Sequence, residues 1–277
     1  MEQWRFIDSG HADGFTNMAV DTALARCYKG SPVLRLYGWR PPAISLGFHQ
    51  RLQELDLAKC RHDGVDVVYR PTGGRAVLHA DEVTYAVILG PGCRLYDERV
   101  MPVYERISQG IMAALALLRI PLVFERAPAL KGAGGRNALS SLCFASSIQY
   151  EIGYGGKKMI GSAQRRFGTT VLQHGSILLG GAHLKLVDYL RPQKEGGGEE
   201  EWRGHARRFM QEKTVALNEI SPSPLDYAGV VDALRRGFAA NRGIIWSGAG
   251  LTEEEATLAA GLREEYKDKI AARGQSG

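Results

Sequence analysis

The fold of this chain is decided by a stretch near its middle, residues 148–163, which reads IQYEIGYGGKKMIGSA. Gly155 and Gly156 can both adopt the positive φ angles that a two-residue hairpin turn requires. Isoleucine and tyrosine, which favour strands, flank this turn. We therefore predict a β-hairpin whose return strand starts at Lys157 and carries Lys158 near its beginning.

Strand-like and helix-like segments alternate along the rest of the chain, without internal repeats. Apolar and alternating runs predict strands at 33–39, 43–47, 66–70, 83–89 and 121–125. Apolar residues at helical spacing, or polar residues able to cap a first turn, predict helices at 18–26, 56–61, 103–118, 225–241 and from 252 onward. This order predicts an α/β (α+β) architecture of mixed β-sheets flanked by helices.

Composition is that of an ordinary globular protein. The chain has 277 residues, 44% of them hydrophobic and 23% charged, which is enough for a large core. Residues 1–8 carry charges, and no apolar run reaches the length of a membrane span, so neither a signal peptide nor a membrane protein is predicted. The four cysteines lack paired spacing, which argues against a disulfide framework or a structural zinc site. We expect a cytoplasmic protein.

The net charge of +5 bears on the choice of partner. The basic residues are scattered and lack the aromatic-interleaved stripe of single-strand binders, so no nucleic-acid partner is expected. A mild basic excess suits an acidic protein partner, which it attracts by electrostatic steering.

Cys143 and Lys158 are the candidates for the chemistry. Cys143 follows a glycine- and serine-rich stretch, 131–141, of the kind that carries function. A thiol becomes a strong nucleophile when a nearby cation stabilises its thiolate, and Lys158 can supply that charge if the loop folds back onto the hairpin. The alternative is an inert small hydrophobic residue, which is what we expect of the other cysteines.

A second glycine-rich segment, 70–79, leaves a predicted strand and reads RPTGGRAVLH. Two adjacent glycines let backbone amides approach an anionic or carbonyl group, and Arg70 and Arg75 could add charge-assisted hydrogen bonds. A plain β-turn is the alternative. His79 and His174 have no companion at metal-ligand spacing, so we expect structural histidines and no metal catalysis.

Four ordered motifs together resemble the lipoate-protein ligase and octanoyltransferase superfamily. They are the segment 70–79, Cys143-Phe144 followed by Tyr150-Glu151, the segment 158–164 (KMIGSAQ) and the segment 173–177 (QHGSI). The resemblance is greatest to the cysteine-dependent octanoyltransferases that load the glycine cleavage H protein. It implies a biotin/lipoate-protein ligase catalytic-domain fold over residues 1–220, with residues 221–277 as a C-terminal helical extension packed on the same domain.

The resemblance also implies a reaction in two steps without ATP, metal or other cofactor. Cys143 would take the octanoyl group from octanoyl-acyl carrier protein as a thioester and pass it to a lysine of the H protein or another lipoyl domain. Lys158 would lower the pKa of Cys143 and contact the acyl carbonyl. The implied substrate-binding residues are Arg70, Thr72, Gly73, Gly74, Arg75, His79, Gly161, Ser162, Ala163 and His174. A monomer is expected.

Three other functions remain alternatives. An ATP-dependent lipoate-protein ligase of the same fold has no use for Cys143, and such ligases usually carry a third glycine where this chain has Arg75. An amidotransferase acting on the H protein differs in the motifs around the cysteine and after the lysine. A non-catalytic acyl- or carrier-binding protein has no chemical need for Cys143 or Lys158.

The C-terminal part is less informative. Residues 194–201 suggest a flexible charged loop, and 218–224 suggest a junction rich in serine and proline. The final residues lack the tryptophan-bearing ending expected of the family. A solvated helix is the simplest interpretation of this tail.

Overall fold

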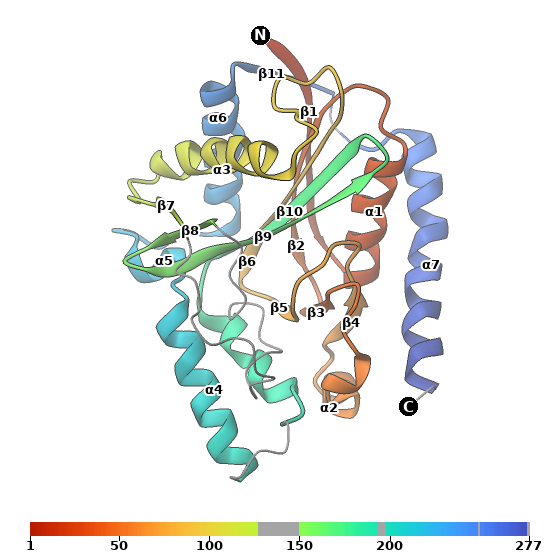
Figure 1. Ribbon diagram of the computed structural model, residues 1–277, viewed down its shortest axis with the longest axis vertical. Helices are drawn as coiled ribbons and strands as arrows, with labels where there is room; N and C mark the ends of the chain where they lie inside the picture. The colour runs from red at the N-terminus through yellow and green to blue at the C-terminus, as the bar shows by residue number, and fades with distance from the viewer. Residues whose placement is uncertain (127–149, 193–197, 249, 276–277) are drawn as a thin grey trace.

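The computed structural model describes residues 1–126, 150–192, 198–248 and 250–275 (Figure 1). A large mixed sheet forms the centre of the fold. Its strands are, from one edge to the other, β11 (Ile244–Ser247), β1 (Glu2–Ala12), β2 (Val33–Trp39), β6 (Glu82–Leu89), β10 (Thr170–Leu178), β9 (Lys157–Phe167), β8 (Tyr150–Tyr154) and β7 (Val123–Arg126). Strand β1 pairs in parallel with both neighbours, whereas the other neighbouring pairs are antiparallel.

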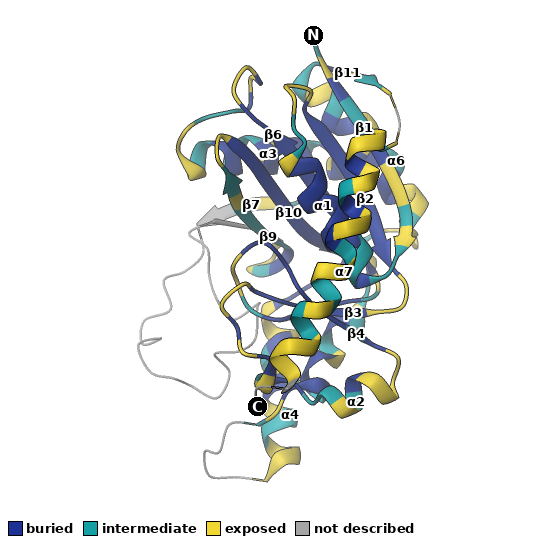
Figure 2. Ribbon diagram, turned by 90° about the vertical axis from the view of Figure 1, so that its right-hand side faces the viewer, coloured by how far each residue is buried: buried dark blue, intermediate teal, exposed yellow. Residues whose placement is uncertain are grey.

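Helices cover both faces of the large sheet (Figures 1 and 2). Tyr85 and Val87 of β6 pack with α3 (Val100–Ala116) and α6 (Tyr227–Arg242) on one face. Ala86 and Ile88 pack on the other face with α1 (Gly14–Arg26), which is covered in turn by α7 (Glu253–Gln275). Successive strand residues point to opposite faces, so a continuous apolar run such as β6 is what a doubly covered strand requires.

A smaller sheet of β4 (Asp66–Tyr69), β3 (Ala43–Leu46) and β5 (Val77–His79) lies beside the large one. It has its own apolar core, in which Leu46 and Leu78 pack against Leu186 and Met210. The helical segments of this part are η1 (Leu52–Glu54), α2 (Leu57–His62), η3 (Gly181–Tyr189), α4 (Glu199–Lys213) and α5 (Leu217–Ile220). The two sheets bring the glycine-rich loop after β4 close to the middle of β10, where Thr72 contacts His174.

The hairpin predicted at 148–163 is confirmed over its described residues. Strands β8 and β9 pair antiparallel, and Gly155 and Gly156 have φ angles of 57° and 75°, as the mirror-image turn requires. The return strand extends to Phe167, beyond the predicted end. Residues 148 and 149 lie outside the described residues.

The remaining predicted strands and helices are found with ends shifted by a few residues, and the mixed α/β fold class is confirmed. Two predicted caps are also present. Asp56 accepts a hydrogen bond from the Lys59 amide at 3.0 Å, and Thr252 and Glu255 exchange hydrogen bonds at the start of α7. No helix in the described part of the chain combines the length and the apolar character needed to cross a membrane.

Two interpretations of the C-terminal part were wrong. Glu199 to Glu201, assigned to a charged loop, form the first turn of α4, where negative charge is favourable at a helix N-terminus. The last helix is more than a solvated helix, because Leu262 is buried against α1 and Tyr266 hydrogen-bonds Thr22. Residues 221–277 also contribute strand β11 to the large sheet; the division at residue 220 stays a prediction.

Candidate active site

A pocket of about 260 Å³ opens between the large sheet, the smaller sheet and α1. Small-molecule sites commonly have volumes of ~300–1,000 Å³, so this pocket suits a small ligand. Apolar side chains from three elements, Met18, Trp39 and Val77, form part of its wall. The pocket brings together most of the residues singled out in the sequence: Arg70, Gly73, Gly74, His79, Lys158, Gly161, Ser162, Ala163 and His174.

Three of the predicted site residues do not line this pocket. Thr72 is a buried residue of the loop and contacts His174, with 2.8 Å between Thr72 Oγ1 and His174 Nε2. Arg75 is half-buried, and its carbonyl oxygen accepts a hydrogen bond from Arg70 Nη2 at 2.7 Å. Cys143 lies outside the described residues. Its role and that of Lys158 stay predictions.

Arg70 fixes the shape of the glycine-rich loop. Its guanidinium donates to the carbonyl oxygen of Gly73 at 2.8 Å and to the carbonyl oxygen of Ser45 at 2.9 Å. Gly74 has a φ of 101°, and a Cβ there would lie 2.5 Å from Arg70 Nη2. A Cβ at Gly47, on the facing loop, would collide with the carbonyl oxygen of Gly74. The glycines thus permit the turn, and the guanidinium of Arg70 stabilises it. Most of the N–H groups of Arg70 donate to carbonyl oxygens of the loop itself.

Lys158 enters the pocket from the hairpin. It is 6% exposed and lines the pocket, and its carbonyl oxygen accepts a hydrogen bond from the amide of Val215. The ladder between β8 and β9 is irregular next to it, where Ile152 pairs with Ile160 but Gly153 pairs with Lys158. A bulge re-aims the side chains of a strand, and here the irregularity lies beside a lysine that lines the pocket.

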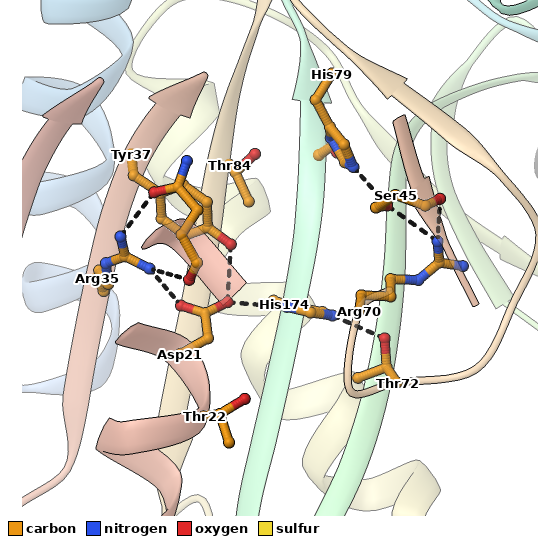
Figure 3. Close-up of polar contacts among 12 residues, drawn as sticks. Asp21, Thr22, Arg35, Tyr37, Ser45, Arg70, Thr72, His79, Thr84 and His174 are labelled. Atoms are coloured by element: carbon orange, nitrogen blue, oxygen red, sulfur yellow. Dashed lines mark hydrogen bonds and ion pairs between the residues drawn. The ribbon is translucent and has the colours of Figure 1, made fainter. Parts of the chain in front are cut away.

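Asp21, which the sequence analysis did not identify, links His174 of the pocket lining to α1 and β2 (Figure 3). Its carboxylate is fully buried and accepts hydrogen bonds from Arg35 at 2.6 Å and from Tyr37 at 2.8 Å. It also lies 2.9 Å from Nδ1 of His174. A neutral His174 that donates from Nδ1 to Asp21 accepts at Nε2 from the hydroxyl of Thr72.

The charge of Asp21 is stabilised in spite of its burial. Desolvation by itself raises the pKa of the Asp21 carboxyl, but Arg35 and the hydrogen bonds from His174 and Tyr37 outweigh it and hold this pKa below its ordinary value. Arg35 is itself 1% exposed and is held by Asn17 and Ser9. The result is a buried ion pair whose hydrogen bonds are satisfied.

A second buried carboxylate, Glu82, supports His79. Its Oε1 atom lies 2.8 Å from His79 Nδ1 and accepts hydrogen bonds from Thr84 at 2.5 Å and from Ser176 at 2.9 Å. Burial raises the pKa of Glu82, but His79 and these hydrogen bonds lower it below its ordinary value. The other ring nitrogen of His79 lies 2.7 Å from Ser45 Oγ. Both ring nitrogens of His79 and of His174 lie within hydrogen-bonding distance of a polar side chain, and both residues line the pocket; their part in substrate binding stays a prediction.

The residues that the sequence analysis missed are single polar side chains inside apolar runs. Asp21 lies in the run MAVDTALA of α1, and Glu82 begins the apolar strand β6. An acidic residue in such a run must be paired once it is buried, and this is the signal that could have identified both. No cluster of three or more His, Cys, Asp or Glu suited to a metal ion occurs within the described ranges.

Residues 13–239 match the family model described as the lipoyl protein ligase A/B catalytic domain. The chain belongs to that family. It is 37% identical over 256 residues to a protein named octanoyltransferase LipM from Symbiobacterium thermophilum, with 91% of each chain covered. It is also 37% identical to an octanoyltransferase LipM from Moorella thermoacetica, with 96% of each covered.

Solved structures of the lipoyl protein ligase family share the fold. A bipartite lipoate protein ligase from Thermoplasma acidophilum superimposes with a TM-score of 0.76 at 19% identity, covering 96% of this chain and 93% of that one. A lipoate-protein ligase A bound with ATP gives a TM-score of 0.73 at 20% identity, covering 96% and 95%. At these identities the likeness establishes the fold but not the activity.

Proposed function

We propose that this chain is an octanoyltransferase of protein lipoylation. It moves an octanoyl group from an acyl carrier protein to a lysine of a lipoyl domain, such as that of the glycine cleavage H protein, through a thioester on Cys143. The observation that carries this proposal is a buried lysine, Lys158, in a partly apolar pocket that also holds the glycine-rich loop. The octanoyltransferase names of relatives at 37% identity support it.

The first step forms the acyl-enzyme. The Cys143 thiolate adds to the thioester carbonyl, and the thiolate of the carrier leaves and takes up a proton. The ammonium of Lys158 stabilises the Cys143 thiolate and donates to the carbonyl oxygen. Gly73 and Gly74 of the loop and Ser162 of β9 line the same pocket, and their backbone amides would supply further donors to the oxyanion.

The second step forms the amide. The neutral ε-amine of the acceptor lysine attacks the acyl-Cys143 carbonyl, the Cys143 thiolate leaves, and the amine nitrogen releases its proton. The octanoyl chain lies against Met18, Trp39 and Val77, since these apolar side chains wall the pocket. Neither step consumes ATP.

An intact-mass experiment tests this function. The protein is incubated with octanoyl-acyl carrier protein without ATP, and we expect a gain of one octanoyl group that hydroxylamine removes. Cys143→Ser must abolish the hydroxylamine-labile adduct, whereas Cys27→Ser, at a half-buried cysteine away from the pocket, must retain it. Acylation of a lipoyl domain that appears only with ATP and free octanoic or lipoic acid would instead identify an ATP-dependent ligase. Failure to turn over any acyl donor would identify a binding protein.

A further inference from the structure

A second pocket, of about 190 Å³, lies on the other side of the glycine-rich loop, between that loop, β9 and α7. Arg70 lines both pockets, and Pro71, the next residue of the loop, lines the second. The two pockets are therefore neighbours that share one wall. A ligand that spans the two would need an apolar end and a polar end.

The second pocket is strongly basic. Arg26, Arg70, Arg165 and Lys269 contribute positive charge to its lining, against one carboxylate, that of Glu265. Arg165 and Lys269 form no ion pair with a carboxylate within the part of the chain that the structure describes. This excess of positive charge is unfavourable in the empty pocket and favours an anion.

The positive charges around Lys269 affect its pKa. Burial lowers the pKa of Lys269, and the neighbouring Arg273 and Arg165 lower it further. A bound anion would raise the pKa of Lys269 again, because an opposite charge stabilises the ammonium form.

Aromatic rings hold the cations in place without neutralising them. The guanidinium of Arg165 lies 5.2 Å from the ring centre of Phe48 and 4.9 Å from that of Phe167. Its Nη1 atom also donates to the carbonyl oxygen of Pro71 at 2.8 Å. The ammonium of Lys269 lies 4.8 Å from the ring centres of both Phe48 and Tyr69. Cations that are fixed in this way lose little side-chain freedom when an anion binds.

We infer that this second pocket binds the phosphate of the pantetheine arm that carries the octanoyl group, while the octanoyl chain occupies the neighbouring pocket. The inference rests on the proposed function, since it specifies the donor of that reaction. Acyl carrier proteins hold acyl groups as thioesters at the end of a phosphopantetheine arm, so the donor combines an apolar end with a phosphate ester. Three arginines and a lysine lining one small pocket match a phosphate better than a neutral group.

The test compares two small thioester donors that differ only in the phosphate, octanoyl-4′-phosphopantetheine and octanoyl-pantetheine. We expect the wild-type protein to have the higher kcat/KM for the phosphorylated donor. Lys269→Gln should lower the ratio of the two kcat/KM values about tenfold, the usual scale for losing one charged hydrogen bond. Glu265→Gln should raise the ratio, because it removes the negative charge from the pocket lining.

Lys267→Gln is the matched control. Lys267 lies on the same helix but pairs with Glu264 and does not line the pocket. The ratio should stay at its wild-type value in this variant. Equal kcat/KM values for the two donors in the wild-type protein would overturn the inference and leave the proposed function intact. An equal fall in kcat/KM for both donors in Lys269→Gln would also overturn the inference and leave the proposed function intact.

Two further measurements separate the remaining outcomes. If no thioester is a donor, the proposed function fails, and calorimetric binding of 4′-phosphopantetheine against pantetheine still decides whether the pocket takes a phosphate. Octanoyl-acyl carrier protein and octanoyl-coenzyme A identify the source of the phosphate. A loss in Lys269→Gln with octanoyl-acyl carrier protein supports the inference, whereas a loss confined to octanoyl-coenzyme A would overturn the assignment to the carrier.

Discussion

Asp21 joins three elements at one carboxylate. It comes from α1, its partners Arg35 and Tyr37 come from β2, and His174 comes from β10. Through His174 the contact continues to Thr72 in the glycine-rich loop. The geometry of that loop therefore depends on a charge buried beneath it, well away from solvent.

Replacing Asp21 by Asn should destabilise the fold by about 3–5 kcal/mol at pH 7, because it leaves the Arg35 guanidinium buried without its counter-charge. The pKa of Asp21 is depressed in the folded state, so its contribution is complete above the unfolded pKa of about 3.9 and is lost as the pH falls through the folded value. Urea unfolding of both proteins at several pH values measures this. The difference between them should shrink toward acid pH, and Asp232→Asn, at a half-exposed carboxylate, should change little.

The close approach of two loops gives a second prediction at this scale. Gly47→Ala places a methyl group against the carbonyl oxygen of Gly74, and overpacking of this kind costs about 1–3 kcal/mol. Thermal unfolding should therefore occur at a lower temperature in Gly47→Ala. Gly73→Ala is the control for stability, since a Cβ there meets nothing within 4 Å. If both variants unfold at the same temperature, the loops are not in contact as described.

Among the elements, α7 both packs on α1 and lines the second pocket. Leu262 and Tyr266 contact α1, and both also line the second pocket together with Lys269. Figure 2 shows the helix lying along the molecule with its other side exposed. The same helix therefore contributes both to the apolar core around α1 and to the wall of the second pocket, and Leu262 belongs to both.

Leu262→Ala should cost about 2–5 kcal/mol of stability, because Leu262 is 2% exposed and its truncation leaves a cavity against α1. Thr257→Ala, at an exposed position of the same helix, should stay within about 0.5 kcal/mol of the wild type. Denaturant unfolding compares the two. A small effect at Leu262 would mean that α7 is not firmly docked in solution.

The sequence predicted those elements whose signals are local. The hairpin followed from Gly155 and Gly156, and the caps at Asp56 and Thr252 followed from their own side chains. The pairing of β11 with β1 and the docking of α7 could not be predicted, since each depends on contacts between residues far apart in the sequence.

The residues of the candidate site likewise divide into those that local motifs identified and those that only the folded chain shows. The glycine-rich loop, Lys158 and His174 were identified through motifs, and the structure places them at one pocket. Asp21 and Glu82 belong to no local motif, so only the folded chain shows what each carboxylate supports. The prediction for Cys143 stays a prediction, because that residue lies outside the described ranges.

At the scale of the whole molecule, the net charge of +5 should affect how fast the donor is captured. An acidic carrier approaches a basic protein faster at low ionic strength, and salt screens this attraction. We expect kcat/KM for octanoyl-acyl carrier protein to fall as NaCl is raised, and to fall less for octanoyl-pantetheine, which has no net charge. Steady-state kinetics over a salt series measures both slopes, and parallel slopes would argue against steering.

The parallel pairing of β1 with β11 also sets the order in which the protein can be completed during synthesis. Glu2 leaves the ribosome well before Ile244, its partner in the sheet. Until that partner emerges, one edge of β1 has unpaired amides and carbonyls, and such an edge can recruit other strands. Contacts between residues this distant in sequence also form slowly. The nascent chain therefore passes through a period of exposure to aggregation, which ends only when β11 pairs with β1.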